Sequence, residues 1–143
     1  AQGFAMDFWR IAMRPGKPLM VGSFGKTYVL GLPGNPVSSL VCSLLFLEPL
    51  IRKLGSLPSV PRETMVEAAV TLRANDHRQD YVRAKLSKSA AGGWLVEPFD
   101  KQDSSMMKTF AHSDCLIIRP PHAPELPAGA TCPVMLLRPD LLA

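Results

Sequence analysis

The stretch of residues 32–39, with the sequence LPGNPVSS, constrains this chain most strongly, because it joins a strand-like run to a long apolar run. Gly34 supplies the backbone freedom that a tight turn needs. Asn35 is a favourable helix N-cap, and Pro36 suits the first helical position, where its missing N–H costs nothing. The pattern therefore predicts a strand, a Gly turn and a helix. The N–H groups and the dipole at the start of that helix suit an anion.

A second rigid turn precedes this stretch at residues 14–18, with the sequence RPGKP. Arg10, Arg14 and Lys17 place three cations in and beside this turn. Two Pro/Gly turns, one cationic and one opening a helix, indicate a phosphate or oxyanion site. Pro-Gly pairs are also ordinary turn punctuation, and a capped helix start occurs in most proteins, so a purely structural role for both turns stays open.

The net charge of +4 is distributed unevenly along the chain. Residues 1–61 carry six cations against Asp7 and Glu48, whereas residues 62–143 carry ten cations and ten anions. The basic excess thus falls in the half that holds the two turns. A small anionic ligand fits this distribution better than nucleic acid, which would require a long basic stripe with interleaved aromatic residues.

The cysteine pattern indicates a reducing compartment, and hence the cytoplasm. Three cysteines stand beside apolar neighbours, none of them in a CxxC pair: Cys42, Cys115 and Cys132. An odd number of such residues indicates buried free thiols. The three histidines occupy separate loop-like contexts without the spacing of metal ligands, so no metal site is predicted in this chain.

The sequence predicts neither a secretory signal nor a membrane span. No basic segment precedes an apolar run at the N-terminus, and the longest apolar helix, near residues 37–54, is interrupted by serines, Glu48 and Pro49. The chain begins at Ala1 without an initiator methionine, and residues 1–4 resemble the end of one element and the start of another. We therefore expect a fragment of a longer protein.

Residues 1–58 are predicted to form strands and turns before one long helix. The expected strands lie at residues 8–13, 19–24 and 28–32, the last two joined by a hairpin at residues 25–27. Apolar residues at helical spacing follow Pro36 and leave little polar surface, so we expect a helix that is buried on most sides. Pro49 either kinks this helix or begins a second one, and Gly55 ends it.

The pattern changes to period two after a Pro-rich linker at residues 57–61, which places a second domain at residues 59–143. Short strands are expected at residues 65–72, 81–88, 94–96, 115–118 and 133–137. Arg83 lies on the outward, polar face of the second of these strands, and a short helix at residues 104–110 has Ser104 as its N-cap. Five short strands with turn signals between them predict a small β-barrel or sandwich.

Two motifs, FWRIAMRPGKP at residues 8–18 and GLPGNPVS at residues 31–38, resemble the molybdopterin molybdenumtransferase family, which includes bacterial MoeA and the gephyrin E domain. Weaker matches follow at residues 80–83 (DYVR), 102–104 (QDS) and 127–130 (PAGA). The resemblance covers essentially the whole chain. It implies an α/β plus all-β fold: the C-terminal part of a three-layer α/β molybdopterin-binding domain in residues 1–58, then a C-terminal β-barrel domain in residues 59–143.

The resemblance also implies an activity: the insertion of molybdate into adenylylated molybdopterin, with release of AMP and the help of a divalent metal, usually Mg²⁺. It implies a homodimer, and it implies the molybdopterin adenylyltransferase as the upstream partner. The family's acidic metal motifs lie upstream of residue 1. We therefore expect this chain alone to be inactive and to bind no catalytic metal tightly.

Residue by residue, the resemblance implies a set that binds substrate and oxyanion, and it assigns no catalytic residue. The members of the set are Arg10, Arg14, Lys17, Pro33, Gly34, Asn35, Pro36, Ser38, Arg83 and Ser104. The last two are the candidates for contacting molybdate. The family commonly has lysine at the positions of Arg10 and Arg14, and arginine holds an oxyanion as a fork where lysine offers a point charge. Asp114 stands where the family often has asparagine, and an acid would not help to bind an anion, so it is left out of the set.

Two alternative hypotheses stay open. A scaffold or oligomerisation module of the gephyrin type would need a large exposed apolar groove in residues 62–143, and nothing in that sequence announces one. A barrel that binds nucleic acid would need a basic face with aromatic side chains, whereas this half of the chain is net neutral.

Overall fold

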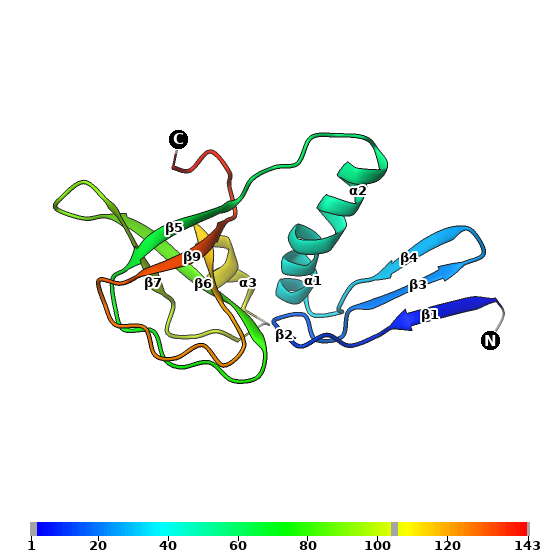
Figure 1. The fold of residues 1–143 in the computed structure, drawn as a ribbon, viewed down its shortest axis with the longest axis horizontal. Coiled ribbons are helices and arrows are strands. Elements are labelled where there is room, and N and C mark those ends of the chain that lie inside the picture. The colour runs from blue at the N-terminus through cyan, green and yellow to red at the C-terminus, as the bar shows by residue number, and fades with distance from the viewer. Residues whose placement is uncertain (1–2, 104–105, 143) are drawn as a thin grey trace. The chain divides into compact units, whose positions relative to one another are not determined.

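The computed structural model describes residues 3–103 and 106–142. The chain divides into two compact units, residues 1–59 and residues 60–143. Each unit has its own set of strands, as the colours of Figure 1 show: blue to cyan in the first unit, and green to red in the second. We describe each unit by itself.

The first unit contains a three-stranded antiparallel sheet in the order β1-β3-β4. Its strands are β1 (Phe4–Phe8), β3 (Met20–Phe24) and β4 (Thr27–Gly31), and a two-residue strand, β2, covers Met13–Arg14. The predicted hairpin is confirmed, because Phe24 pairs with Thr27 across a turn in which Gly25 has a φ of 58°. The strand predicted at residues 8–13 is wrong. The regular strand ends at Phe8, and the N–H of Ile11 donates to the carbonyl of Lys17, so the chain already bends toward the next turn.

One helical run follows the sheet, in three pieces: α1 (Pro36–Cys42), a π-helical segment η1 (Ser43–Leu47) and α2 (Glu48–Leu54). Pro36 occupies the first turn of α1 and Gly55 caps the end of α2, as predicted. Pro49 lies in the first turn of α2, so it begins a second helix. A proline ring clashes with the carbonyl four residues before it and supplies no N–H, and the wider π turn accommodates both defects.

The expectation that this helix is buried on most sides is wrong for its C-terminal half. Val37 and Val41 of α1 are fully buried. Ile51 and Leu54 of α2, in contrast, are 55% and 65% exposed. The described residues of the unit therefore cover the helix closely only along α1.

The second unit is a closed β-barrel built, within its described residues, from five strands and one short helix. These elements are β5 (Glu63–Ala68), β6 (Gln79–Lys88), β7 (Trp94–Pro98), α3 (Met107–Ala111), β8 (Cys115–Arg119) and β9 (Thr131–Leu136). The strands are neighbours in the order β6-β7-β5-β9-β8, and β8 pairs again with β6. The long strand β6 closes the barrel because residues 80–84 pair with β8 and residues 84–88 pair with β7. Of the two architectures predicted, the barrel is confirmed.

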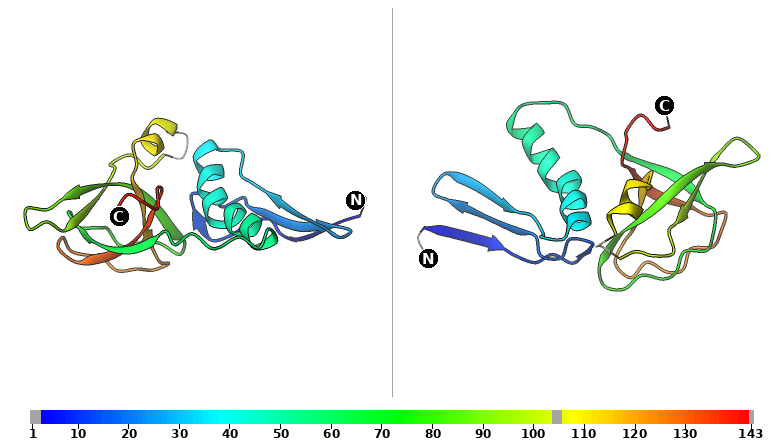
Figure 2. Two further views of the ribbon diagram at one scale, coloured as in Figure 1. Left: turned by 90° about the horizontal axis from the view of Figure 1, so that it is seen from above. Right: turned by 180° about the vertical axis from the view of Figure 1, so that it is seen from behind.

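The barrel core consists of the side chains on the inner faces of its strands. Its buried members are Val66, Ala68, Leu72, Ala84, Val96, Cys115, Ile117, Cys132, Val134 and Leu136. The strands wrap around this interior in both views of Figure 2. The predicted alternation in residues 65–72 holds as far as Ala68, where β5 ends, and Val70 is 37% exposed. No helix in the described part of the chain combines the length and the apolar character needed to cross a bilayer.

Candidate functional site

The turn at residues 14–18 lies directly against α1. Gly16 has a φ of 112°, in the left-handed region that favours glycine, and its peptide follows a cis bond between Arg14 and Pro15. A Cβ atom on Gly16 would stand 2.6 Å from Sγ of Cys42 and 3.2 Å from Cε of Met13. The thiol of Cys42 in turn faces the carbonyl oxygen of Gly16 at 3.9 Å. The cationic turn is therefore fixed to the last residue of α1, roughly 9 Å along the helix axis from Pro36.

The three cations of this segment are exposed side chains. Arg10, Arg14 and Lys17 all lie on the solvent side of the chain. The guanidinium of Arg10 stacks over the ring of Trp9, with 3.8 Å between Cζ and the ring centroid. Stacking on an aromatic face leaves the N–H edges of a guanidinium available to an anion.

The start of α1 has the predicted residues but not the predicted capping bond. Asn35 occupies the N-cap position, and its carbonyl accepts the N–H of Ser39 at 2.8 Å. Its side chain makes no capping hydrogen bond, and Oδ1 is buried with no partner among the described residues. Pro33 and Ser38 are buried, whereas Gly34 and Pro36 are exposed. The first N–H groups of the helix are therefore not taken by the Asn35 side chain.

Arg83 differs most from its prediction. It was expected on a solvated strand face, yet it is only 2% exposed. Phe99, Gln102 and Met106, which follow β7 in the sequence, contact this part of β6. The N–H of Phe99 donates to the Arg83 carbonyl at 3.0 Å, and Nη1 of Arg83 donates to the Met106 carbonyl at 3.4 Å. Gln102 supplies the remaining contacts of this cluster.

The Arg83 guanidinium is buried beside neutral oxygen acceptors. Nε donates to Oε1 of Gln102 at 3.4 Å, and the partner of Nη1 is a peptide carbonyl. Burial lowers the pKa of Arg83, and the nearby charge of Asp103 opposes that shift. Within residues 3–103 and 106–142, no carboxylate forms an ion pair with this guanidinium. A buried charge of this kind is stabilised when an opposite charge is brought to it.

Ser104 lies outside the described residues, so its place in the set stays a prediction. The helix expected at residues 104–110 is described as α3, with Met106 at its N-cap position. Asp114, which the sequence analysis left out, has a structural task. Its Oδ2 accepts the N–H of Leu86 at 3.0 Å, and its Oδ1 lies 3.3 Å from Nη2 of Arg138.

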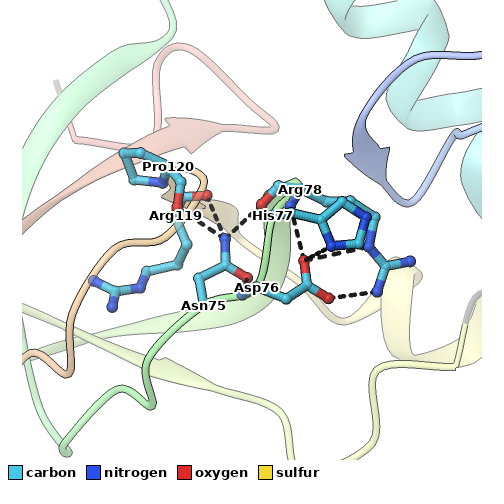
Figure 3. A network of polar contacts seen from close by, with 6 residues as sticks. All are labelled: Asn75, Asp76, His77, Arg78, Arg119 and Pro120. Atoms are coloured by element: carbon cyan, nitrogen blue, oxygen red, sulfur yellow. Dashed lines mark hydrogen bonds and ion pairs between the residues drawn. The ribbon is translucent and has the colours of Figure 1, made fainter.

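A second polar cluster ties two loops of the barrel together and is shown in Figure 3. Nδ2 of Asn75 donates to the carbonyls of Arg78, Arg119 and Pro120 at 2.7, 2.9 and 2.9 Å. The carboxylate of Asp76 pairs with Nη2 of Arg78 at 2.6 Å. Among the described residues, the Asn75 side chain contacts backbone groups, so it holds the two loops together.

The described residues do not provide a site for a divalent metal. No group of three or more His, Cys, Asp or Glu side chains in the described part of the chain could hold an ion. Hard cations such as Mg²⁺ take several oxygen ligands. We therefore derive no chemical step through a metal held by this chain.

Two family models match this chain. Residues 65–137 match the family described as MoeA C-terminal region (domain IV), and residues 1–53 match the family described as probable molybdopterin binding domain. A Haemophilus influenzae protein named molybdopterin molybdenumtransferase is 32% identical over 128 residues, which cover 88% of this chain and 32% of the relative. The chain thus spans about a third of the length of the curated relatives that it matches.

Solved structures show the same fold. The molybdopterin biosynthesis MoeA protein of Pyrococcus horikoshii superposes with a TM-score of 0.73 at 27% identity, over 93% of this chain and 32% of that one. A molybdenum cofactor biosynthesis protein of Pyrococcus furiosus gives a TM-score of 0.74 at 19% identity, over 92% and 45% of the two chains. On the strength of the match over residues 65–137, which make up half of the chain, the chain belongs to the family described as MoeA C-terminal region (domain IV).

Proposed function

We propose that this chain supplies the oxyanion-handling part of an enzyme that inserts molybdate into adenylylated molybdopterin and releases AMP. The observation that carries the proposal is the burial of Arg83, a residue that is 2% exposed and whose guanidinium is hydrogen-bonded to neutral oxygens alone within the described residues. The curated relatives named molybdopterin molybdenumtransferase support the choice of reaction.

A buried guanidinium suits the molybdate substrate for an electrostatic reason. Molybdate is a dianion, and a fork of N–H donors can bind two of its oxygens at once. The attraction is stronger where water is excluded, because the effective dielectric constant is lower there. Arg83 would hold molybdate in place while its oxo groups are displaced by the sulfur atoms of molybdopterin, and it would offset the charge repulsion between the two anionic substrates.

The exposed cations and the start of α1 complete the proposed binding set. We assign the anionic phosphates of adenylylated molybdopterin to the residues of the first unit: Arg10, Arg14, Lys17, Pro33, Gly34, Asn35, Pro36 and Ser38. The uncapped N–H groups of α1 support this assignment. Ser104, close in sequence to Gln102, completes the proposal on the molybdate side.

The proposal includes the wider properties that the resemblance implies. The reaction uses Mg²⁺ bound by residues outside this chain, the protein acts as a homodimer in the cytoplasm, and the molybdopterin adenylyltransferase supplies its substrate. Each of these is a separate hypothesis, open to analytical ultracentrifugation, fractionation or a metal-dependence assay on the full protein that carries this segment.

The test of the proposed function uses that full protein with adenylylated molybdopterin, molybdate and Mg²⁺, and it follows the release of AMP. Arg83→Ala and Arg14→Ala are compared with Arg138→Ala, which removes an arginine whose side chain is 65% exposed and lies outside the set. We expect a loss of turnover of about a hundredfold or more in the first two variants and an unchanged rate in the third.

Unaltered turnover in both Arg83→Ala and Arg14→Ala would reject the site. A complete lack of turnover in the unaltered protein would reject the reaction and favour the scaffold hypothesis. Far-UV circular dichroism of each variant separates a lost site from a lost fold.

A further inference from the structure

The Gln102 side chain replaces part of the backbone pairing at the end of the ladder between β6 and β7. The ladder between β6 and β7 ends at the pair Ala84–Pro98. In a continued antiparallel ladder, the N–H and carbonyl of Arg83 would both bond to Phe99. Phe99 instead donates its N–H to the Arg83 carbonyl at 3.0 Å, and the Gln102 side chain enters between the two residues.

The Gln102 amide uses its full hydrogen-bonding capacity there. Oε1 accepts the Arg83 N–H at 3.0 Å and Nε of the Arg83 guanidinium at 3.4 Å. Nε2 donates to the Arg83 carbonyl at 3.0 Å and to the Phe99 carbonyl at 2.7 Å. Two acceptor positions and two donor positions exhaust a primary amide. One side chain thereby fixes the backbone of Arg83 on both sides and the first nitrogen of its guanidinium.

We infer that Gln102 is a positioning residue for the oxyanion, acting through Arg83. The inference rests on the proposed function, in which Arg83 binds molybdate. By bonding Nε, Gln102 fixes the plane of the guanidinium, and Nη2 makes no hydrogen bond among the described residues. Gln102 is neutral, so it orients the cation without cancelling the charge that the dianion requires. Glutamate in the same place would do the opposite.

The isosteric substitution Gln102→Glu separates positioning from packing. It keeps the length of the side chain, yet it places a second carboxylate oxygen against the carbonyls of Arg83 and Phe99 and a negative charge beside the guanidinium. Gln102→Met keeps the volume and removes all four hydrogen bonds. Asn75→Ala is the matched control, because Asn75 is another side-chain amide of the barrel whose contacts are with backbone and do not include Arg83.

The experiment measures the KM for molybdate and the KM for adenylylated molybdopterin separately on the full protein, together with calorimetric titration of sodium molybdate. Arg83→Lys is measured alongside. We expect Gln102→Glu and Gln102→Met to raise the molybdate KM by about tenfold or more, and to weaken the calorimetric affinity in parallel. The KM for the nucleotide substrate stays within about twofold. Asn75→Ala lowers the melting temperature without this split.

Three outcomes would overturn the inference, and they differ in which part of the proposed function they leave intact. If Arg83→Lys raises the molybdate KM while both Gln102 variants do not, the positioning role is wrong and the proposed function survives. If none of the three variants changes the molybdate KM or the calorimetric affinity, both the positioning role and the assignment of molybdate to Arg83 are wrong. A rise in both KM values that Asn75→Ala reproduces assigns Gln102 to general stability and also rejects the inference.

Discussion

The sulfur of Cys42 lies 3.9 Å from the carbonyl oxygen of Gly16, at a position where no side chain on residue 16 could fit. A turn that carries cations is thereby fixed to a helix 26 residues later in the chain. The two residues meet because one has no Cβ and the other ends in a single compact atom. Small residues on both sides are what permit the turn to lie on α1.

Gly16→Ala should be strongly destabilising, because the new methyl group would collide with Cys42 and Met13 and because the φ of 112° is unfavourable for alanine. We expect the free energy of unfolding to fall by about 3 kcal/mol or more, from a backbone term and an overpacking term together. Gly25→Ala is the control. Gly25 also has a positive φ but would meet no atom within 4 Å, so a loss of about 1 kcal/mol is expected. Equal losses of unfolding free energy in Gly16→Ala and Gly25→Ala, measured by urea denaturation, would contradict the close contact between residue 16 and Cys42.

Alkaline pH should weaken the fold through its buried thiols. Burial raises the pKa of Cys42 from 9.0 to about 11, which favours the neutral thiol in the folded state. The stability gained in this way is complete below pH 9, where the unfolded thiol is also neutral, and it is lost as the pH rises through 11. The expected slope from this group is about 1.4 kcal/mol per pH unit.

The pH dependence of unfolding in Cys42→Ala isolates the contribution of this thiol. The variant should show a shallower fall between pH 9 and pH 11 than the unaltered chain, whatever its stability at pH 7. Burial and the charge of Asp114 raise the pKa of Cys115 to about 12, so that thiol contributes in the same direction at higher pH. If the unfolding free energies of Cys42→Ala and the unaltered chain fell in parallel with pH, the pKa of Cys42 would not change between the folded and unfolded states.

Asp114→Asn should be nearly neutral, whereas Asp114→Ala should not. Asparagine still offers an oxygen to the N–H of Leu86 and gives up an ion pair with an exposed arginine, which contributes less than about 1 kcal/mol. Alanine leaves that N–H without its acceptor, at a cost of about 1–3 kcal/mol. Urea denaturation measures the free energy of unfolding of the two variants. Equal values would show that the hydrogen bond from the Leu86 N–H to Asp114 contributes little to stability.

Asn75→Ala should loosen the barrel end shown in Figure 3. The variant removes the N–H donor shared by the carbonyls of Arg78, Arg119 and Pro120, and we expect a loss of about 2–3 kcal/mol in the free energy of unfolding. His77→Ala is the control in the same loop, because that side chain is 72% exposed. A change within about 0.5 kcal/mol is expected for the control. Faster amide exchange at His122, whose N–H donates to the Asp76 carbonyl, would report the same loosening.

Local signals allowed much of the fold to be predicted from the sequence. Pro36 and Gly55 mark the start and the end of the helical run because capping chemistry depends on a few neighbouring residues. Period-two alternation located Val66 and Ala68 on an inner face for the same reason. The strand predicted at residues 8–13 was wrong because apolar residues alone do not distinguish a paired strand from an irregular segment. A hydrogen bond from the Ile11 N–H to the Lys17 carbonyl bends the chain there.

The candidate site was less predictable, because the burial and the hydrogen bonds of its residues depend on residues distant in sequence. The alternation places Arg83 on the outward face, and it gives no sign of the contacts that Gln102 and Met106 make with this residue. Gln102 belongs to the short motif at residues 102–104, and one polar residue in a loop gives no indication of its hydrogen-bond partner. The hydrogen bond of Asp114 depends on Leu86 of β6, which is distant in sequence, so no local pattern could have shown it.

The pairing of β5 with β9 also has a consequence for synthesis. Residues 63–67 find their partners at residues 131–135, so the first barrel strand to leave the ribosome waits for the last. Until then, β5 has only the short parallel contact of Glu67 and Ala68 with β7, and its edge is open to other nascent chains. Without residues 131–135, one edge of β5 and one edge of β8 would lack a partner, and the barrel could not close. Closure of this domain therefore depends on a pairing between the first and the last of its described strands.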